Sequence, residues 1–468
     1  MADPRKRRPR REQRPRRAAV DPAREAAYDV LAAVREQDAY TNLVLPQVLR
    51  GREVSGRDAA FATELASGTI RRQGTYDAVL AANLDRPLAK VQPAVLDVLR
   101  LGVHQILSMR VPSHAAVGTS VDLVRAKVGQ GPAGFVNAVL RRVAGNDLSG
   151  WVRRVAPDPS TDPVGFASVA HSHPSWVVSA LSEALGPAAD ELDALLSADN
   201  VPPKVTLVAR PGLATVEELV AAGGTASSLS PYAVQLAGGD PGDVPAVAEG
   251  RAGVQDEGSQ LVALGLAEAG VEGRDERWLD LCAGPGGKSA LLTALTGERG
   301  ARLLASERQP HRAELVRTAT LAARGTGLLG VIAADGTRPA WREGTFDRAL
   351  VDAPCTGLGA LRRRPEARWR RSPSDLENLV PLQRALLSSA LDSVRPGGVV
   401  AYSTCSPVLA ETAGVVTEVL ESRSDAVLED ASGLFGIDDC VGPLTGTVQL
   451  WPHRHGTDAM FFALLRRR

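Results

Sequence analysis

The chain has 468 residues, of which 44% are hydrophobic and 23% charged, and its formal net charge is zero. This length predicts two to four domains, and the composition is typical of a folded globular protein. Because no apolar run approaches the roughly 20 residues that span a bilayer and the basic N-terminus lacks the apolar stretch of a signal peptide, we expect a cytoplasmic protein without a membrane partner.

Residues 1–20 form a run of positive charge that proline interrupts. They contain nine Arg or Lys residues and two acidic ones, so the rest of the chain has 45 basic and 52 acidic residues. Such a run is typical of a disordered tail, which either solvates the chain or makes weak, salt-sensitive contact with RNA. A polyanion would otherwise have to bind local basic patches, because the remaining body is slightly acidic.

Residues 21–147 are predicted to form an all-α bundle. Short breaks at 85–87 and 110–114 separate the helices. Apolar residues recur at i, i+3 and i+4 in the segments 23–34, 58–72, 91–107, 120–128 and 133–143.

Residues 148–245 are predicted to hold a linker and a small α/β subdomain. The linker is the Pro- and Asp-rich stretch 156–163. A helix with Pro in its first turn follows within 172–185. Residues 203–210 alternate like a strand, and 215–224 read as a helix that glycine ends.

From residue 246 to the C-terminus, strands alternate with helices. This alternation predicts an α/β domain with a doubly wound, mostly parallel, Rossmann-like sheet, whose ligands bind at the carboxyl ends of the strands. One intervening helix covers 381–394. The predicted strands are 278–282, 302–306, 329–334, 348–352 and 398–404.

A glycine-rich turn follows the first of these strands and indicates a cofactor site. Glycines allow close approach of a ligand to the backbone, and the following helix offers free N–H groups. The second strand ends in Glu307, suited to ribose hydroxyls, and the third in Asp335, suited to an adenine amino group. The set predicts an adenosine-type ligand. The turn consists of Cys282, Ala283, Gly284, Pro285, Gly286, Gly287 and Lys288.

The next two strands end in turns that each carry a cysteine. Asp352 precedes Cys355 by three residues, and Cys405 directly follows the last strand. Both cysteines lie in polar, Pro-containing turns, unlike the buried apolar setting of most structural cysteines, so either could be an activated thiolate nucleophile. The other two cysteines, Cys282 and Cys440, fit structural roles. No cysteine pair has metal-site spacing, so we expect no metal.

Four segments resemble the NOL1/NOP2/Sun family of RNA cytosine-C5 methyltransferases. They are DLCAGPGGK (280–288), DAPCTGLGALRRRPEARW (352–369), YSTCS (402–406) and HGTDAMFF (455–462), and VQDEGSQLVA (254–263) looks like the family's stretch ahead of the first strand. The resemblance implies S-adenosylmethionine as the cofactor, bound by 282–288, Glu307, Asp335 and Asp352. Glu307 and Met460 stand where the family often has Asp and Phe.

By the same resemblance, Cys405 is implied as the nucleophile that attacks C6 of cytosine. Cys355 is implied in release of the product, and Asp352 in contact with the base. The residues by themselves, without the resemblance, leave open whether Cys355 or Cys405 attacks C6.

The helical region resembles the NusB-type RNA-binding domain, in residues 57–72, 99–124 and 135–143. The fusion of such a domain to this methyltransferase implies small-subunit (16S) rRNA as the partner, with cytosine 967 as the target, and nothing demands a dimer, so we expect a monomer. A tRNA cytosine-C5 methyltransferase is the alternative enzyme. A non-catalytic RNA-binding or antitermination factor is disfavoured, because a binder needs no Cys355, Cys405 and Asp352.

Residues 362–371 hold six arginines and Trp369 directly after the Cys355 turn. Arginine forks suit phosphates and tryptophan can stack on a base, so this run is predicted to contact RNA. The alternative is a helix face with internal salt bridges.

Overall fold

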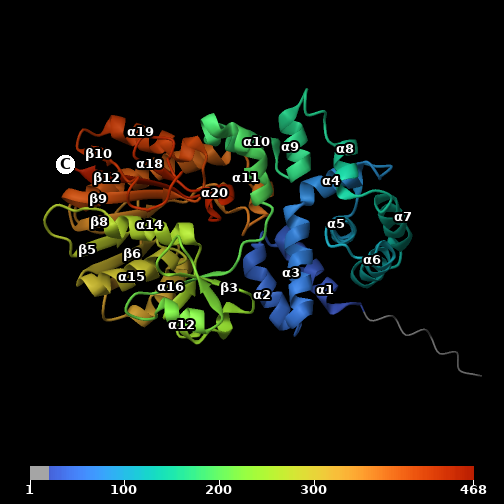
Figure 1. Cartoon of the computed structure of the whole chain (residues 1–468), viewed down its shortest axis with the longest axis horizontal. Coiled ribbons are helices and arrows are strands. Elements are labelled where there is room, and N and C mark those ends of the chain that lie inside the picture. The colour runs from blue at the N-terminus through green and yellow to red at the C-terminus, as the bar shows by residue number, and fades with distance from the viewer. Residues whose placement is uncertain (1–19) are drawn as a thin grey trace, which may run out of the picture. The chain divides into compact units, whose positions relative to one another are not determined.

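The computed structural model describes residues 20–468. The basic run predicted as a disordered tail therefore lies outside the described residues, except for Val20. The chain divides into two compact units, Met1–Ala156 and Pro157–Arg468, which Figure 1 shows in blue to teal and in green to red. Within the described part of the chain, every helix is too short or too polar to cross a membrane.

The first unit is the predicted helical bundle. Val98, Leu99 and Leu140 are among the residues of its single large apolar core. Asp21 caps the first helix by accepting a hydrogen bond from the backbone N–H of Arg24. The helices are α1 (Pro22–Glu36), α2 (Thr41–Gly51), α3 (Gly56–Arg71), α4 (Gln73–Ala81), α5 (Pro93–Leu107), α6 (Ser113–Lys127), α7 (Ala133–Val143) and α8 (Leu148–Val155), with a short 3₁₀ turn η1 (Leu88–Lys90).

Helix α8 extends this unit past the predicted boundary at residue 147. Trp151 is buried in the bundle core, and its indole N–H donates to the carbonyl of Val143 on α7 at 2.8 Å. Because the tryptophan ties α8 to the bundle, the first unit ends at Ala156.

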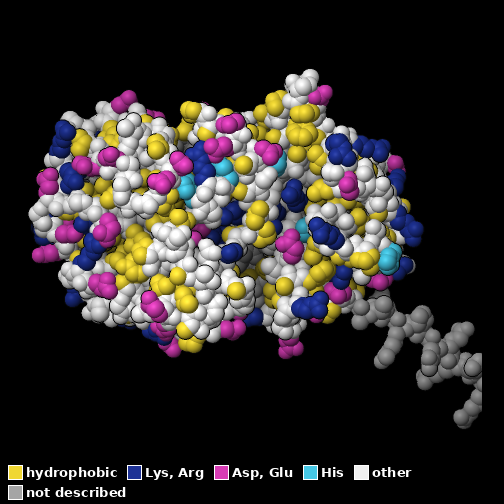
Figure 2. All heavy atoms as spheres, in the orientation of Figure 1, with side chains coloured by type: hydrophobic (Ala, Val, Ile, Leu, Met, Phe, Trp, Pro, Cys, Tyr) yellow, Lys and Arg dark blue, Asp and Glu magenta, His cyan; other side chains and the backbone are white. Residues whose placement is uncertain are grey.

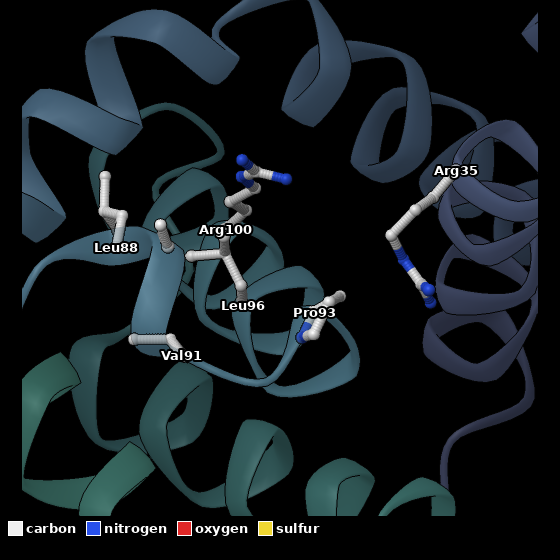
Figure 3. A pocket seen from close by; sticks show the side chains of 7 residues that line it. Arg35, Leu88, Val91, Pro93, Leu96 and Arg100 are labelled. Atoms are coloured by element: carbon white, nitrogen blue, oxygen red, sulfur yellow. The ribbon is translucent and has the colours of Figure 1, made fainter.

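A shallow apolar pocket of about 320 Å³ opens on the bundle beside the N-terminus of α5. Apolar side chains that include Leu88, Val91 and Leu96 line it together with Arg35 and Arg100 (Figure 3). Both guanidinium groups are bonded to carboxylates of the same unit. Arg35 donates to the buried Asp97 at 2.8 Å, and Arg100 makes a bidentate pair with Asp77.

The second unit begins with three helices and a small antiparallel sheet. The sheet order is β2-β3-β1-β4. Its last strand, β4, lies beyond the predicted subdomain boundary at residue 245. It belongs to this sheet because residues 207–209 of β1 pair with it. The elements are α9 (Pro163–His171), α10 (Ser175–Leu185), η2 (Gly186–Glu191), α11 (Leu192–Ala198), β1 (Thr206–Ala209), α12 (Val216–Ala221), β2 (Gly224–Ala226), β3 (Ala233–Leu236), η3 (Pro241–Asp243), α13 (Pro245–Ala248) and β4 (Ala252–Val254).

The main sheet has the order β10-β12-β9-β8-β5-β6-β7, with β11 paired to β12. Its five predicted strands are all present and mutually parallel, so the doubly wound α/β prediction is confirmed. The antiparallel strands β10, β11 and β12 were not predicted. The strands are β5 (Arg277–Asp280), β6 (Arg302–Glu307), β7 (Leu328–Ala333), β8 (Phe346–Asp352), β9 (Val394–Thr404), β10 (Ala426–Glu429), β11 (Val448–Gln449) and β12 (Phe461–Arg467).

Helices cover both faces of this sheet, as Figure 1 shows. Adjacent residues of β5 point to opposite faces. Trp278 packs in one core with α14 and α15, and Leu279 packs in the other core with α18 and α19. The helices are α14 (Glu257–Glu268), α15 (Gly287–Arg299), α16 (Pro310–Ala319), α17 (Ala367–Arg370), α18 (Asp375–Ser393), α19 (Ala413–Ser422) and α20 (Pro452–His455), with 3₁₀ turns η4 (Leu321–Ala323), η5 (Leu358–Ala360) and η6 (Leu409–Glu411).

Candidate active site

The glycine-rich turn follows the carboxyl end of β5 and continues into the first two residues of α15. The backbone N–H of Gly284 donates to Glu307 Oε2 at 3.0 Å, and Arg312 donates to the carbonyl of Gly284 at 2.6 Å. A Cβ on Gly284 would lie 2.2 Å from that Glu307 oxygen, and one on Gly286, where φ is +116°, would lie 2.7 Å from the Cβ of Ala319. Side chains at these two glycines would therefore displace the groups that hold the turn.

The two acids predicted for the adenosine moiety follow the next two strands. Glu307 ends β6, is buried, and also accepts the backbone N–H of Gln309 at 2.9 Å. Asp335 follows β7 and accepts the hydroxyl and backbone N–H of Thr337 at 2.8 and 3.0 Å. These bonds lower the pKa of Asp335, so its carboxylate is ionised and its other oxygen can accept a ligand donor.

Asp280, the last residue of β5, was not among the predicted site residues. Its Oδ2 accepts the hydroxyl of Ser289 at 2.6 Å, while Oδ1 is buried without a hydrogen-bond partner. Burial raises the pKa of Asp280 to about 7. The residue lies two positions before the predicted turn and opens the segment 280–288 that carries the family resemblance, and this position was the available signal.

The donor and acceptor set fits S-adenosylmethionine. An orphaned buried carboxylate oxygen suits an ammonium group of an amino acid. Because the glycines of the turn have no Cβ, a ligand can lie against their backbone. The carboxylates of Glu307 and Asp335 can accept hydrogen bonds from the hydroxyl and amino groups of a nucleoside.

Lys288 lies at the start of α15 and bonds to a residue of the second predicted site. Its Nζ is 2.8 Å from Asp352 Oδ2. Burial opposes the charged form of Lys288, but the Coulomb attraction and hydrogen bond of Asp352 outweigh it and raise the pKa of the lysine. The partner of this lysine is therefore a carboxylate of the protein itself.

The two cysteine turns lie side by side because β8 and β9 are neighbouring parallel strands, with Asp352 opposite Ser403. The sulfur atoms of Cys355 and Cys405 are 3.4 Å apart. The backbone N–H of Gly359 donates to the carbonyl of Cys405 at 2.8 Å, which joins the two turns directly.

The surroundings of the two thiols shift their pKa values in opposite directions. Contact with the Cys355 thiol, which can donate to a thiolate on Cys405, lowers the pKa of Cys405. Burial and Asp352 oppose this lowering, and the cations Lys288 and Arg364 reinforce it. The same hydrogen bond, burial and the nearby Glu411 raise the pKa of Cys355 well above its usual value. The pair thus favours a thiolate on Cys405 and a thiol on Cys355.

The remaining cysteines have the settings expected of structural residues. Burial raises the pKa of Cys282 well above its usual value. Cys440 is buried and its thiol donates to the carbonyl of Ile437 at 3.0 Å.

The arginine run 362–371 is largely an internal structural element, so the predicted RNA contact is wrong for its buried members. Arg368 is fully buried and donates to the carbonyls of Ser172 and Asp199 and to Asn200 Oδ1.

Arg362 is also buried, and its guanidinium donates to Asp458 at 3.2 Å and to the carbonyl of Gly456 at 2.8 Å. Arg363 pairs with both Asp256 and Asp458. Arg364 is the member exposed to solvent. On the face that Figure 2 shows, acidic and basic side chains of this unit are interspersed.

A doubly wound sheet with a glycine-rich turn and two acids at three neighbouring strand ends, and a pair of thiols in contact at the next two, fits a Rossmann-like methyltransferase. Residues 271–466 match the family model described as 16S rRNA methyltransferase RsmB/F, and residues 21–145 match the NusB family.

Relatives and solved structures agree over nearly the whole chain. The chain is 52% identical to Rv1407 of Mycobacterium tuberculosis, provisionally named a methyltransferase, over 97% of its own length and 98% of that protein. It is 32% identical to ribosomal RNA small subunit methyltransferase B of Pseudomonas putida, over 94% and 97% of the two chains. The solved structure of PH0851 superposes with a TM-score of 0.78 at 21% identity, over 97% of this chain and all of that one.

The chain belongs to the 16S rRNA methyltransferase RsmB/F family and is an RNA methyltransferase. The predicted resemblances to the NusB family and to this methyltransferase family are confirmed by these matches.

Proposed function

We propose that this protein methylates C5 of a cytosine in small-subunit rRNA through a covalent bond between Cys405 and C6, and that cytosine 967 is its target. The single observation that carries the chemistry is the pair of thiols in contact at 3.4 Å, at the carboxyl ends of neighbouring strands. The name of the Pseudomonas putida relative and the NusB match support the choice of substrate.

The thiol pair suits a reaction in which one sulfur attacks while the other stays protonated. C5 of cytosine is a weak carbon nucleophile. Addition of the Cys405 thiolate to C6 breaks the C5=C6 double bond and makes C5 enamine-like. The lowered pKa of Cys405 raises the thiolate fraction at neutral pH, as nucleophilic catalysis requires.

Once C5 carries the methyl group as well as its proton, the enzyme must undo the addition. A base removes the proton from C5, the electron pair of that bond restores C5=C6, and the C6–S bond breaks with its pair leaving on Cys405. Cys355 lies against the attacking sulfur, so it is placed to assist this elimination.

Asp352 is the group that we propose to contact the base. Lys288 holds its Oδ2, which leaves Oδ1 to accept a proton-bearing group on the edge of the cytosine. The ion pair therefore orients the carboxylate and supplies a cation close to the attacking sulfur.

Residues 282–288, Asp280, Glu307 and Asp335 would hold S-adenosylmethionine, which supplies an electrophilic methyl group on a sulfonium sulfur. Glu307 would accept the ribose hydroxyls and Asp335 the adenine amino group, as argued above from the strand ends. Asp280 would accept the ammonium group with its unpartnered Oδ1.

The test is methyl transfer to unmodified small-subunit rRNA, followed by mapping of the methylated base, with tRNA as the competing substrate. The proposal expects 5-methylcytosine at position 967 and no transfer by Cys405→Ala. Transfer to tRNA alone would replace the proposed substrate, and an active Cys405→Ala variant would refute the mechanism.

A further inference from the structure

A buried hydrogen-bond network joins the two cysteine turns to one carboxylate. Glu411, at the end of η6, is fully buried. Its Oε1 accepts the backbone N–H of Thr356 at 2.8 Å and the side-chain N–H of Gln383 at 3.0 Å. Its Oε2 accepts the hydroxyl of Thr356 at 2.5 Å. None of these three donors is charged, so the carboxylate acts here as a shared acceptor.

The network holds the Cys355 turn from both sides. Thr356 is the residue after Cys355, and both its backbone N–H and its hydroxyl are bound to Glu411. Pro354 is the residue before Cys355, and its carbonyl accepts from the same Gln383 amide at 2.8 Å. The backbone that carries the thiol is therefore fixed on either side by side chains from α18 and η6.

The same carboxylate reaches the Cys405 turn through one further hydroxyl. Thr356 Oγ1 and Ser406 Oγ are 2.9 Å apart. Because the Thr356 hydroxyl donates to Glu411, the Ser406 hydroxyl is the donor in this contact. The backbone carbonyl of Glu411 in turn accepts the hydroxyl of Tyr402 on β9 at 2.7 Å. Strand β9 carries Cys405 directly after its last residue.

We infer that Glu411 is a positioning residue that holds Cys355 and Cys405 in sulfur contact. This inference rests on the proposed two-thiol mechanism and adds the group that sets its geometry. Without the carboxylate, Thr356 and Gln383 would lose their common acceptor. The hydroxyl contact between Thr356 and Ser406 would no longer be anchored, although the backbone bonds from Ala353 to Ser403 and from Gly359 to Cys405 would remain. A displacement of about 1 Å at reacting groups can cost about 100-fold in rate.

Replacement by alanine and by glutamine separates positioning from charge. Glutamine can accept both N–H groups on its oxygen and donate its own amide to Thr356 Oγ1, so the network survives without the negative charge. We expect Glu411→Ala to lower kcat about 100-fold with KM for RNA and Kd for S-adenosylhomocysteine unchanged. We expect Glu411→Gln to stay within about 10-fold of the wild type. If Glu411→Gln were as inactive as Glu411→Ala, charge rather than positioning would be the role of Glu411.

A probe of the thiol pair reports the geometry without any turnover. Phenylarsine oxide bridges two thiols that lie in contact, and a monothiol wash removes it from single ones. The wild type should retain one equivalent after the wash, and Cys355→Ser should lose it. Glu411→Ala should also lose retention, and Glu411→Gln should keep it. Retention and kcat at wild-type level in Glu411→Ala would overturn the inference.

Two further variants guard against general loss of structure. Glu418→Ala removes an exposed carboxylate on α19, seven residues along the chain, which pairs with Arg384 on the surface, and should behave as the wild type. Thr356→Val removes only the hydroxyl link between Glu411 and Ser406. If Glu411→Ala does not fold, Thr356→Val takes its place in the test. This variant should show both weaker retention of the arsenical and a lower kcat, and wild-type values for both would count against the network. An active Cys405→Ala variant would instead refute the proposed function, so the two failures are distinct.

Discussion

Replacing Gly284 with alanine tests the cofactor site in its tightest place. The new Cβ would lie 2.2 Å from Glu307 Oε2 and 2.9 Å from Arg312 Nε, closer than real Cβ contacts allow. Because these atoms are the ends of flexible side chains, we expect the side chains of Glu307 and Arg312 to move while the backbone conformation of the turn is retained. Glu307 would then lose its bond to the Gly284 N–H and its place for the ribose.

The size of the effect follows from one lost charge-assisted hydrogen bond. Such a bond contributes about 1.5–3 kcal/mol, which corresponds to an affinity loss of about 10- to 100-fold. Titration calorimetry with S-adenosylhomocysteine measures this loss. Gly270→Ala is the matched control, because a Cβ there meets no atom within 4 Å. An unchanged Kd in Gly284→Ala, with a melting temperature near that of the wild type, would refute the assignment of Glu307 to the ribose.

Three other changes probe the charges of the site and its surroundings. Lys288→Met removes a cation that lowers the pKa of Cys405, so kcat at neutral pH should fall at least 10-fold and recover toward higher pH; a pH–rate profile with an unshifted rising limb would contradict this. For Asp280, whose pKa burial raises to about 7, the folded state holds its proton while the unfolded state releases it from about pH 4. Stability is therefore lost as pH rises from about 4 through about 7, and Asp280→Asn, melted without cofactor, should lack this loss; equal pH dependence of melting in both proteins would refute it. Arg368→Met should lower stability by about 3 kcal/mol and leave the salt dependence of RNA binding unchanged, whereas a flatter salt dependence at normal melting temperature would restore the RNA-contact reading.

The sheet and the positions of the reactive groups were predictable because they follow from local patterns. Buried parallel strands appear as short apolar runs, and the residues just past them meet at one edge of the sheet. This is why Glu307, Cys355 and Cys405 could be named from sequence. Strand β12 was not predicted, because an apolar run of its length is equally compatible with a buried helix.

The features that sequence did not reveal depend on contacts between distant segments. Arg368 looks like part of a solvent-facing run, yet its partners are backbone carbonyls more than 160 residues earlier in the chain. Gln383 and Glu411 are 28 residues apart and lie on different elements. No local spacing indicates that the Gln383 amide donates to the Glu411 carboxylate. Asp280 is distinguished by the missing partner of its Oδ1.

The central claim is that Cys405 attacks the base, and a trapped adduct tests it most directly. Cys355→Ala should accumulate a covalent enzyme–RNA species, because release is impaired while attack is intact. Digestion and mass spectrometry should locate the nucleotide on the peptide that contains Cys405, and Cys355→Ala combined with Cys405→Ala should give none. A nucleotide on any other residue, or an adduct that survives the loss of Cys405, would contradict the account.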